Sequence, residues 1–111
     1  LYFAPYRSGM AMAKNRYGID EPTCRPVEWV TAWQLDLMLL PLVAFDDNGN
    51  RLGMGGGFYD RTLAYRRART RSLRPKLIGL AHELQREEQL DTNSWDIPLD
   101  MIATEQRIIS V

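Results

Sequence analysis

Thiol and imidazole groups are scarce in this chain, which carries one cysteine, Cys24, and one histidine, His82, among 111 residues. A lone cysteine cannot form an intrachain disulfide and is typical of a reducing compartment, so we expect a cytoplasmic protein. The same scarcity argues against a zinc site and against a Cys–His nucleophile. We expect neither a signal peptide nor a membrane span, because no apolar run is long enough for one.

Net charge is also lacking, because 14 basic side chains balance 14 acidic ones. This balance does not favour a nucleic-acid partner or a membrane surface. Six arginines nevertheless gather between positions 61 and 74. Such a run is usually a solvated helix face, and contact with an anionic partner is the alternative. With 45% hydrophobic and 25% charged residues, the composition predicts one small globular domain over residues 1–111.

Glycine, in contrast, is concentrated at Gly53, Gly55, Gly56 and Gly57, between a strand-like apolar run and a helix-like segment. Exposed backbone N–H groups just before a helix bind anions well, so the segment predicts a site for a phosphate-bearing ligand. Neither common nucleotide loop fits, since Phe58 stands where a dinucleotide fingerprint needs its last glycine and where a Walker loop needs lysine. The alternative is a glycine-rich turn that only lets a strand and a helix pack closely.

The segments around the glycines alternate between strand and helix patterns. The apolar run 35–45 predicts a strand buried on both faces of a parallel sheet, and residues 46–50 predict a tight turn. A helix is expected over about 58–71. Further expected elements are strands over 77–81, 101–103 and 107–111 and a short helix over 83–90. A short helical or turn segment is expected over 28–34, with Trp29 and Trp33 on one face if it is helical. This alternation predicts a layered α/β sheet.

Longer strings of the sequence resemble a known family. The stretches Leu40–Asp46 and Arg51–Arg61 are similar to the signature of the 5-formyltetrahydrofolate cyclo-ligases, also called 5,10-methenyltetrahydrofolate synthetases. Asn15–Pro22, Ile78–His82 and Trp95–Asp100 resemble further segments of that family, in the same order. The resemblance implies a Rossmann-like three-layer α/β/α sheet. It also implies ATP- and magnesium-dependent cyclisation of 5-formyltetrahydrofolate to 5,10-methenyltetrahydrofolate, a step of folate one-carbon metabolism.

The resemblance also assigns site residues. It implies that ATP is bound by Arg51, Leu52, Gly53, Met54, Gly55, Gly56, Gly57, Phe58 and Tyr59, of which positions 54–58 also line the folate side. Asp60 and Asp96 match positions that bind magnesium, a cation that prefers carboxylate oxygens. Without the resemblance, Asp60 is a carboxylate at a helix N-terminus and Asp96 an exposed acid in a turn. Arg61 stays open between a phosphate contact and a solvated helix residue.

One departure from the family concerns length. Its members are nearly twice as long, and this chain begins in what looks like the family's middle, so we expect the N-terminal segments that contact ATP and folate to be absent. Apolar surface would then be exposed and covered by self-association or by another chain. Two functions therefore stay open: an ATP-dependent cyclo-ligase, and a truncated, non-catalytic module that binds a nucleotide or a folate and is completed by oligomerisation.

Overall fold

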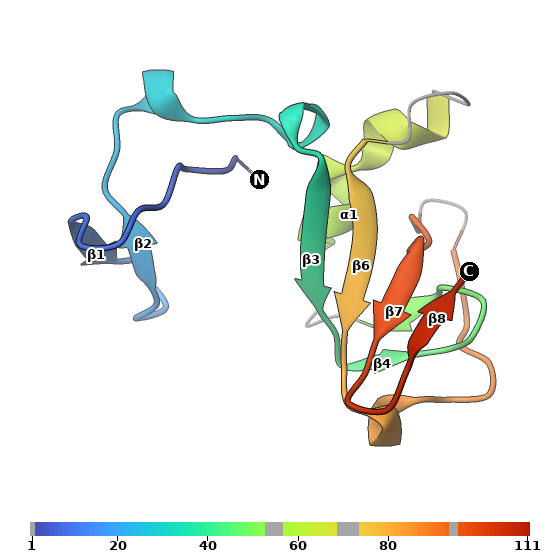
Figure 1. Cartoon of the computed structure of the whole chain (residues 1–111). Coiled ribbons are helices and arrows are strands. Elements are labelled where there is room, and N and C mark those ends of the chain that lie inside the picture. Colours follow the sequence, from blue (N-terminus) through green and yellow to red (C-terminus); the bar gives the residue numbers. More distant parts are fainter. Residues whose placement is uncertain (1, 53–56, 69–73, 94–95) are drawn as a thin grey trace.

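A mixed four-stranded sheet organises the computed structural model, which describes residues 2–52, 57–68, 74–93 and 96–111 (Figure 1). Its strands are β3 (Leu37–Pro41), β6 (Lys76–Leu80), β7 (Met101–Ala103) and β8 (Ile108–Ser110), in that spatial order. β3 and β7 run parallel to β6, and β8 is antiparallel to β7. The strands expected over 77–81, 101–103 and 107–111 are confirmed to within two residues at either end.

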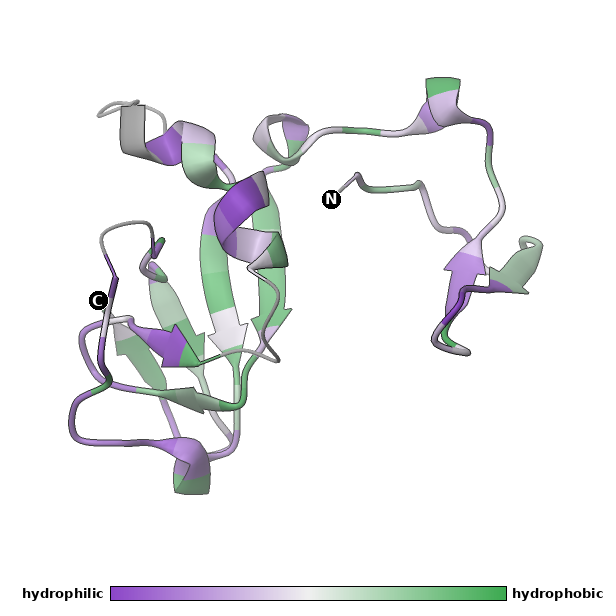
Figure 2. Cartoon of the chain, turned by 180° about the vertical axis from the view of Figure 1, so that it is seen from behind, coloured by the Kyte–Doolittle hydropathy of each residue, from purple (hydrophilic) through white to green (hydrophobic). Residues whose placement is uncertain are grey.

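Helical segments cover one face of this sheet. α1 (Phe58–Thr62) lies behind β3 and β6 in Figure 1 and in front of them in Figure 2, and the 3₁₀ helix η3 (Ala64–Ala68) follows it near the end of the sheet at which β3 and β6 begin. The predicted α/β class is confirmed by this packing. The helix expected over about 58–71 does begin at Phe58, but its α-helical part ends at Thr62, and residues 69–73 lie outside the described part of the chain.

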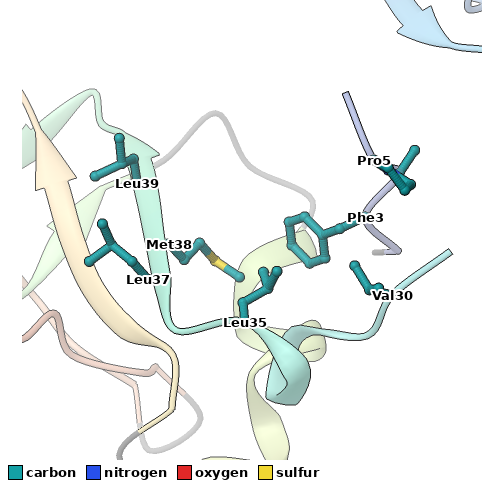
Figure 3. A pocket seen from close by; sticks show the side chains of 8 residues that line it. Phe3, Pro5, Val30, Leu35, Leu37, Met38 and Leu39 are labelled. Atoms are coloured by element: carbon teal, nitrogen blue, oxygen red, sulfur yellow. The ribbon is translucent and has the colours of Figure 1, made fainter. Parts of the chain in front are cut away.

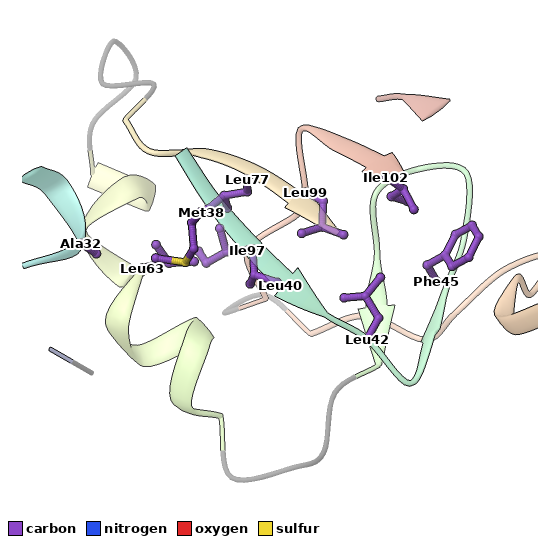
Figure 4. Packing of buried hydrophobic residues seen from close by; sticks show 10 residues of the cluster. All are labelled: Ala32, Met38, Leu40, Leu42, Phe45, Leu63, Leu77, Ile97, Leu99 and Ile102. Carbon is purple, nitrogen blue, oxygen red and sulfur yellow. The ribbon is translucent and has the colours of Figure 1, made fainter. Parts of the chain in front are cut away.

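The hydrophobic core lies between these helices and the sheet (Figure 4). Leu63, at the junction of α1 and η3, packs with side chains that β3, β6 and β7 turn toward it, and it has no exposed surface. The other members come mainly from the strands and from the segment before β7: Ala32, Met38, Leu40, Leu42, Phe45, Leu77, Ile97, Leu99 and Ile102. Ile97 and Leu99 thereby anchor the C-terminal segment that carries Asp96.

The prediction that the run 35–45 is a strand buried on both faces is wrong. Its residues form two strands, β3 and β4 (Ala44–Phe45), because Pro41 has no N–H to extend the ladder and the chain turns away to pair with β5 (Arg51–Leu52). Burial alternates along β3: Met38 and Leu40 face the core, whereas Leu37 and Leu39 are 49% and 53% exposed. Among the described residues, no helix covers that second face.

Residues 46–50 form the predicted tight turn, which connects β4 to β5. Its first residue, Asp46, is fully buried, and its carboxylate accepts hydrogen bonds from the N–H groups of Asn48 and Asn50 at 3.0 and 3.1 Å. The Leu90 N–H donates to the same carboxylate at 3.0 Å. The turn therefore holds both the β4–β5 hairpin and the segment after the 3₁₀ helix η4 (Glu83–Gln85).

The two expected short segments are confirmed only in part. The segment 83–90 is helical only in η4, because Arg86 forms a bridge to Phe45 and the chain then runs along the hairpin. The segment 28–34 contains parts of two separate 3₁₀ turns, η1 (Pro26–Glu28) and η2 (Ala32–Gln34). Trp29 and Trp33 therefore do not share a helix face; their rings pack on Tyr2 and Tyr65, at centroid distances of 5.4 and 5.7 Å.

The N-terminal third lies beside the sheet and contributes little to the core. β1 (Met12–Lys14) and β2 (Asp20–Pro22) form a small antiparallel hairpin away from the main sheet (Figure 1). Phe3 pairs with Val30 in an isolated bridge and packs against the core cluster. No helix among the described residues has both the length and the apolar character needed to cross a membrane.

Candidate functional site

The ends of the predicted ATP-binding stretch are described by the structure, but its middle is not. Arg51 and Leu52 form β5, and Gly57, Phe58 and Tyr59 begin α1, whereas Gly53, Met54, Gly55 and Gly56 lie outside the described residues. Gly57 is the N-cap of α1 and has a left-handed backbone with φ of 64°. A glycine is favoured there because side chains disfavour this conformation. The assignment of the whole stretch to ATP stays a prediction.

Arg51 and Asp60 flank the glycine segment and form an ion pair. The Arg51 Nη2 lies 2.8 Å from Asp60 Oδ1, and the Arg51 side chain is only 8% exposed. The same Asp60 oxygen accepts the backbone N–H of Ile97 at 3.0 Å. Arg51 Nη1 in turn donates to the Ile97 carbonyl. We call this closed set of hydrogen bonds the Arg51–Asp60–Ile97 ring.

The ring brings the two predicted magnesium ligands into the same region. Asp96 directly precedes Ile97, so the hydrogen bond to Asp60 holds the two acids near each other although they are distant in the sequence. Asp96 has a partner of its own: its Oδ2 accepts the Asn93 N–H at 2.8 Å, and its N–H donates to the Asn93 carbonyl at 3.1 Å. Its carboxylate is therefore oriented by the local turn.

This donor set fits a hydrated magnesium ion and does not form a complete protein cage. Within the described part of the chain, hydrogen bonds reach one oxygen of Asp60 and one of Asp96, and the second oxygen of each carboxylate receives none from those residues. No group of three or more metal-binding side chains occurs within the described ranges. Magnesium is commonly held by one or two carboxylates together with waters and substrate phosphates, so two acids suffice chemically.

An open depression of about 400 Å³ lies beside Asp96. Arg66 and Asp100 supply charge to it; Arg66 Nη2 is 3.4 Å from Asp100 Oδ2, and Arg66 Nη1 donates to the Pro75 carbonyl. Asp100 also accepts the Leu77 N–H at 2.8 Å, which ties the depression to β6. Its lining consists of Asn48, Arg66, Asp96, Ile97, Pro98, Leu99, Asp100 and Val111.

Sequence reasoning did not single out Arg66 or Asp100 as part of this region. Arg66 was one of a run of arginines interpreted as a solvated helix face, and its side chain is instead only 11% exposed. The available signal was Asp100 at the end of the Trp95–Asp100 string, since that string already included Asp96. Arg61, by contrast, is exposed, and its guanidinium lies 5.1 Å from the centroid of the Phe58 ring.

A second, apolar groove of about 490 Å³ runs along the open edge of β3 (Figure 3). Phe3 and Val30 form one wall, and Leu35 and Met38 form the other. Every residue that lines it is apolar, so the groove offers no group for acid–base, nucleophilic or phosphate chemistry. The candidate site is therefore the region of the Arg51–Asp60–Ile97 ring and the depression beside Asp96.

Comparison with known proteins connects this geometry to a family. Residues 1–105 match the model of the 5-formyltetrahydrofolate cyclo-ligase family. The chain belongs to that family. The predicted resemblance is thereby confirmed over nearly the whole sequence.

Cyclo-ligases from several bacteria are similar in sequence. The chain is 46% identical over 99 residues to the 5-formyltetrahydrofolate cyclo-ligase of Haemophilus influenzae. The aligned region covers 89% of this chain and 51% of the relative. It is 39% identical over 108 residues to the 5-formyltetrahydrofolate cyclo-ligase of Escherichia coli K12, and this aligned region covers 97% of this chain and 57% of the relative. The chain thus spans about half the length of these cyclo-ligases.

Solved structures of methenyltetrahydrofolate synthetases have a similar fold. The 5,10-methenyltetrahydrofolate synthetase of Aquifex aeolicus superimposes with a TM-score of 0.73 at 34% identity, over 93% of this chain and 48% of that one. The synthetase of Mycoplasma pneumoniae superimposes with a TM-score of 0.54 at 33% identity, over 82% and 52%. The α/β sheet described above is therefore the corresponding part of the methenyltetrahydrofolate synthetase fold.

Proposed function

We propose that this chain takes part in the ATP- and magnesium-dependent cyclisation of 5-formyltetrahydrofolate to 5,10-methenyltetrahydrofolate. In this reaction the formyl oxygen attacks the terminal phosphorus of ATP, and ADP leaves. The second folate nitrogen then attacks the activated formyl carbon and closes the ring. The former formyl oxygen leaves with the phosphoryl group as inorganic phosphate. Such chemistry requires mainly positioning and charge neutralisation from a protein.

In this proposal, different residues of the chain bind ATP, the folate and magnesium. The stretch 51–59 binds ATP, and positions 54–58 also face the folate. Asp60 and Asp96 hold magnesium, which supplies neutralisation of the phosphate charge when it is bound. The observation that carries the proposal is the hydrogen bond of 3.0 Å between the Ile97 N–H and Asp60, because it brings two distant acids to the end of the glycine segment in a cyclo-ligase family member.

A second candidate function is binding of the nucleotide or the folate without turnover. The observation in its favour is the sheet face that carries Leu37 and Leu39, which no described helix covers. An exposed apolar face of this kind usually meets another protein surface. The module would then act only together with a further copy or another chain.

Magnesium-dependent binding of ATP tests the proposed function without requiring turnover. We expect calorimetry to detect ATP binding that strengthens with magnesium. Asp60→Asn should weaken the magnesium-dependent part by at least about 10–100-fold, since loss of a residue that only orients a metal ligand already has an effect of that size. Asp91→Asn, which removes an equally charged but exposed acid, is the matched control and should bind as the unaltered chain does. Equal affinity of the Asp60→Asn variant and the unaltered chain would contradict the assignment of Asp60.

A further inference from the structure

The charged end of Arg51 is almost buried, and two of its nitrogens bond to protein groups. Nη2 pairs with Asp60 Oδ1 at 2.8 Å, and Nη1 donates to the Ile97 carbonyl. The Ile97 N–H closes the ring by donating to the same Asp60 oxygen at 3.0 Å. Both polar groups of the Ile97 backbone are therefore satisfied by one ion pair.

The ring joins three separate parts of the chain. Arg51 comes from β5, Asp60 from α1 and Ile97 from the segment before β7. A planar guanidinium can donate hydrogen bonds to two acceptors at once in fixed directions. A lysine ammonium on its flexible side chain does this less well. The ring thus fixes the orientation of the Asp60 carboxylate and, through Ile97, the location of the neighbouring Asp96.

We propose that Arg51 is a positioning residue for the magnesium site and does not itself bind a phosphate. This inference rests on the proposed function and narrows it, because it removes Arg51 from the direct contacts of the ATP-binding stretch. The Arg51 side chain is only 8% exposed, and a phosphate bound by Nη1 and Nη2 would displace Asp60 and the Ile97 carbonyl, both of which would lose a charge-assisted partner in a largely buried place. Groups that orient metal-binding carboxylates strongly affect metal affinity even though they touch no metal.

The positioning role and a simple charge effect predict opposite results. Arg51 is a cation next to a metal-binding carboxylate, so if only its charge mattered, its removal would strengthen magnesium binding. If its hydrogen bonds place Asp60 and Asp96, removal weakens magnesium binding despite the lost repulsion. A direct phosphate contact predicts a third result, which is weaker nucleotide binding even in the absence of magnesium.

The experiment compares Arg51→Met, Arg51→Lys and Arg25→Met by NMR on the chain as it stands. Arg25 is the matched control, because it is an exposed arginine at the start of η1, outside the proposed site, and its replacement removes the same charge. The measurements are amide hydrogen exchange at Ile97, magnesium affinity with ADP present, and ADP affinity with a chelator present. Arg51→Lys keeps the charge and one hydrogen bond, so it tests the role if Arg51→Met does not fold.

We expect Arg51→Met to speed exchange at the Ile97 amide and to weaken magnesium by about 10–100-fold, with Arg51→Lys between it and the unaltered chain. ADP affinity without magnesium should change less than about threefold, well under the effect of losing a charge-assisted phosphate contact. Arg25→Met should change none of the three measurements. Tighter magnesium binding, unchanged Ile97 exchange, or an equal loss of ADP with and without magnesium would overturn the inference. An unaltered chain that binds no magnesium nucleotide would instead overturn the proposed function, and the exchange data would still report on the ring.

Discussion

Replacing Asp46 by asparagine should lower the free energy of unfolding by about 2–5 kcal/mol, one of the largest effects in this chain. The Asp46 carboxylate is fully buried and accepts four hydrogen bonds, from the N–H groups of Asn48, Asn50 and Leu90 and from the Asn50 side chain. An asparagine presents one amide nitrogen where the carboxylate has an oxygen. Two of the four donors would therefore face a donor inside the protein.

The contribution of Asp46 to the free energy of unfolding should also depend on pH. Burial alone would raise the pKa of its carboxyl, but the hydrogen bonds from Leu90, Asn50 and Asn48 outweigh burial and hold the pKa below its ordinary value of 3.8. A group whose pKa is lowered by folding stabilises the folded state above the ordinary pKa, and this contribution is lost as pH falls through the folded value. The difference between the unaltered chain and Asp46→Asn should shrink over that acidic range.

Chemical denaturation at neutral and acidic pH measures both parts of this prediction. Asp47→Asn is the matched control, since the neighbouring Asp47 is exposed and paired with Arg86 on the surface, where ion pairs contribute little. The Asp47 variant should lose clearly less stability than the Asp46 variant. Equal losses for the two variants would show that the buried network does not hold the turn.

Replacing Gly49 by alanine should destabilise the fold by about 2–5 kcal/mol, because it adds backbone strain to overpacking. Gly49 has a left-handed backbone with φ of 83°, and a Cβ there would lie 2.7 Å from the Leu99 carbonyl oxygen and 2.9 Å from Val111 Cγ1. Its own carbonyl accepts the Leu99 N–H at 2.8 Å. The turn and the segment that carries Asp96 and Ile97 therefore fit together only without a side chain at position 49.

Gly18→Ala separates the two causes. Gly18 has a similar φ of 77°, but a Cβ there meets nothing within 4 Å. Its replacement should cost only the backbone strain, about 1–2 kcal/mol. Thermal unfolding of both variants gives the difference, which we assign to the contact with Leu99 and Val111. A Gly18 variant as unstable as the Gly49 variant would show that this contact is unimportant.

The sequence predicted those turns, helix starts and strands that are determined by neighbouring residues. The turn at 46–50 and the start of α1 at Phe58 follow from turn-forming residues and from the end of a glycine run. β6 follows from a short apolar run. In each case neighbouring residues in the sequence determine the structure, so no knowledge of the tertiary packing is needed.

The exposed face of β3 could not be predicted in the same way. An alternation of apolar and polar residues normally reveals a strand with one exposed face, but in β3 the outward residues Leu37 and Leu39 are as apolar as the buried ones. Whether such a strand is covered depends on elements elsewhere in the fold. The sequence pattern of β3 does not carry this information.

The sequence indicated some members of the candidate site, but neither their partners nor Arg66 and Asp100 in the depression beside Asp96. The family resemblance indicated Arg51, Asp60 and Asp96, and whether they bind ATP and magnesium stays a prediction. No sequence pattern indicated that Arg51 pairs with Asp60 or that both side chains form hydrogen bonds with the Ile97 backbone. These contacts depend on the side-chain directions that packing produces. Local reasoning alone favoured an exposed acid at Asp96 and a helix-end carboxylate at Asp60.

The most direct test of the account is the absorbance of 5,10-methenyltetrahydrofolate formed from 5-formyltetrahydrofolate, ATP and magnesium by the purified chain. Asp60→Asn and omission of magnesium are the controls. We predict product with the unaltered chain and little or none in either control. Absence of product under conditions in which the chain binds magnesium ATP would contradict the cyclo-ligase function of this chain and favour the non-catalytic binding module.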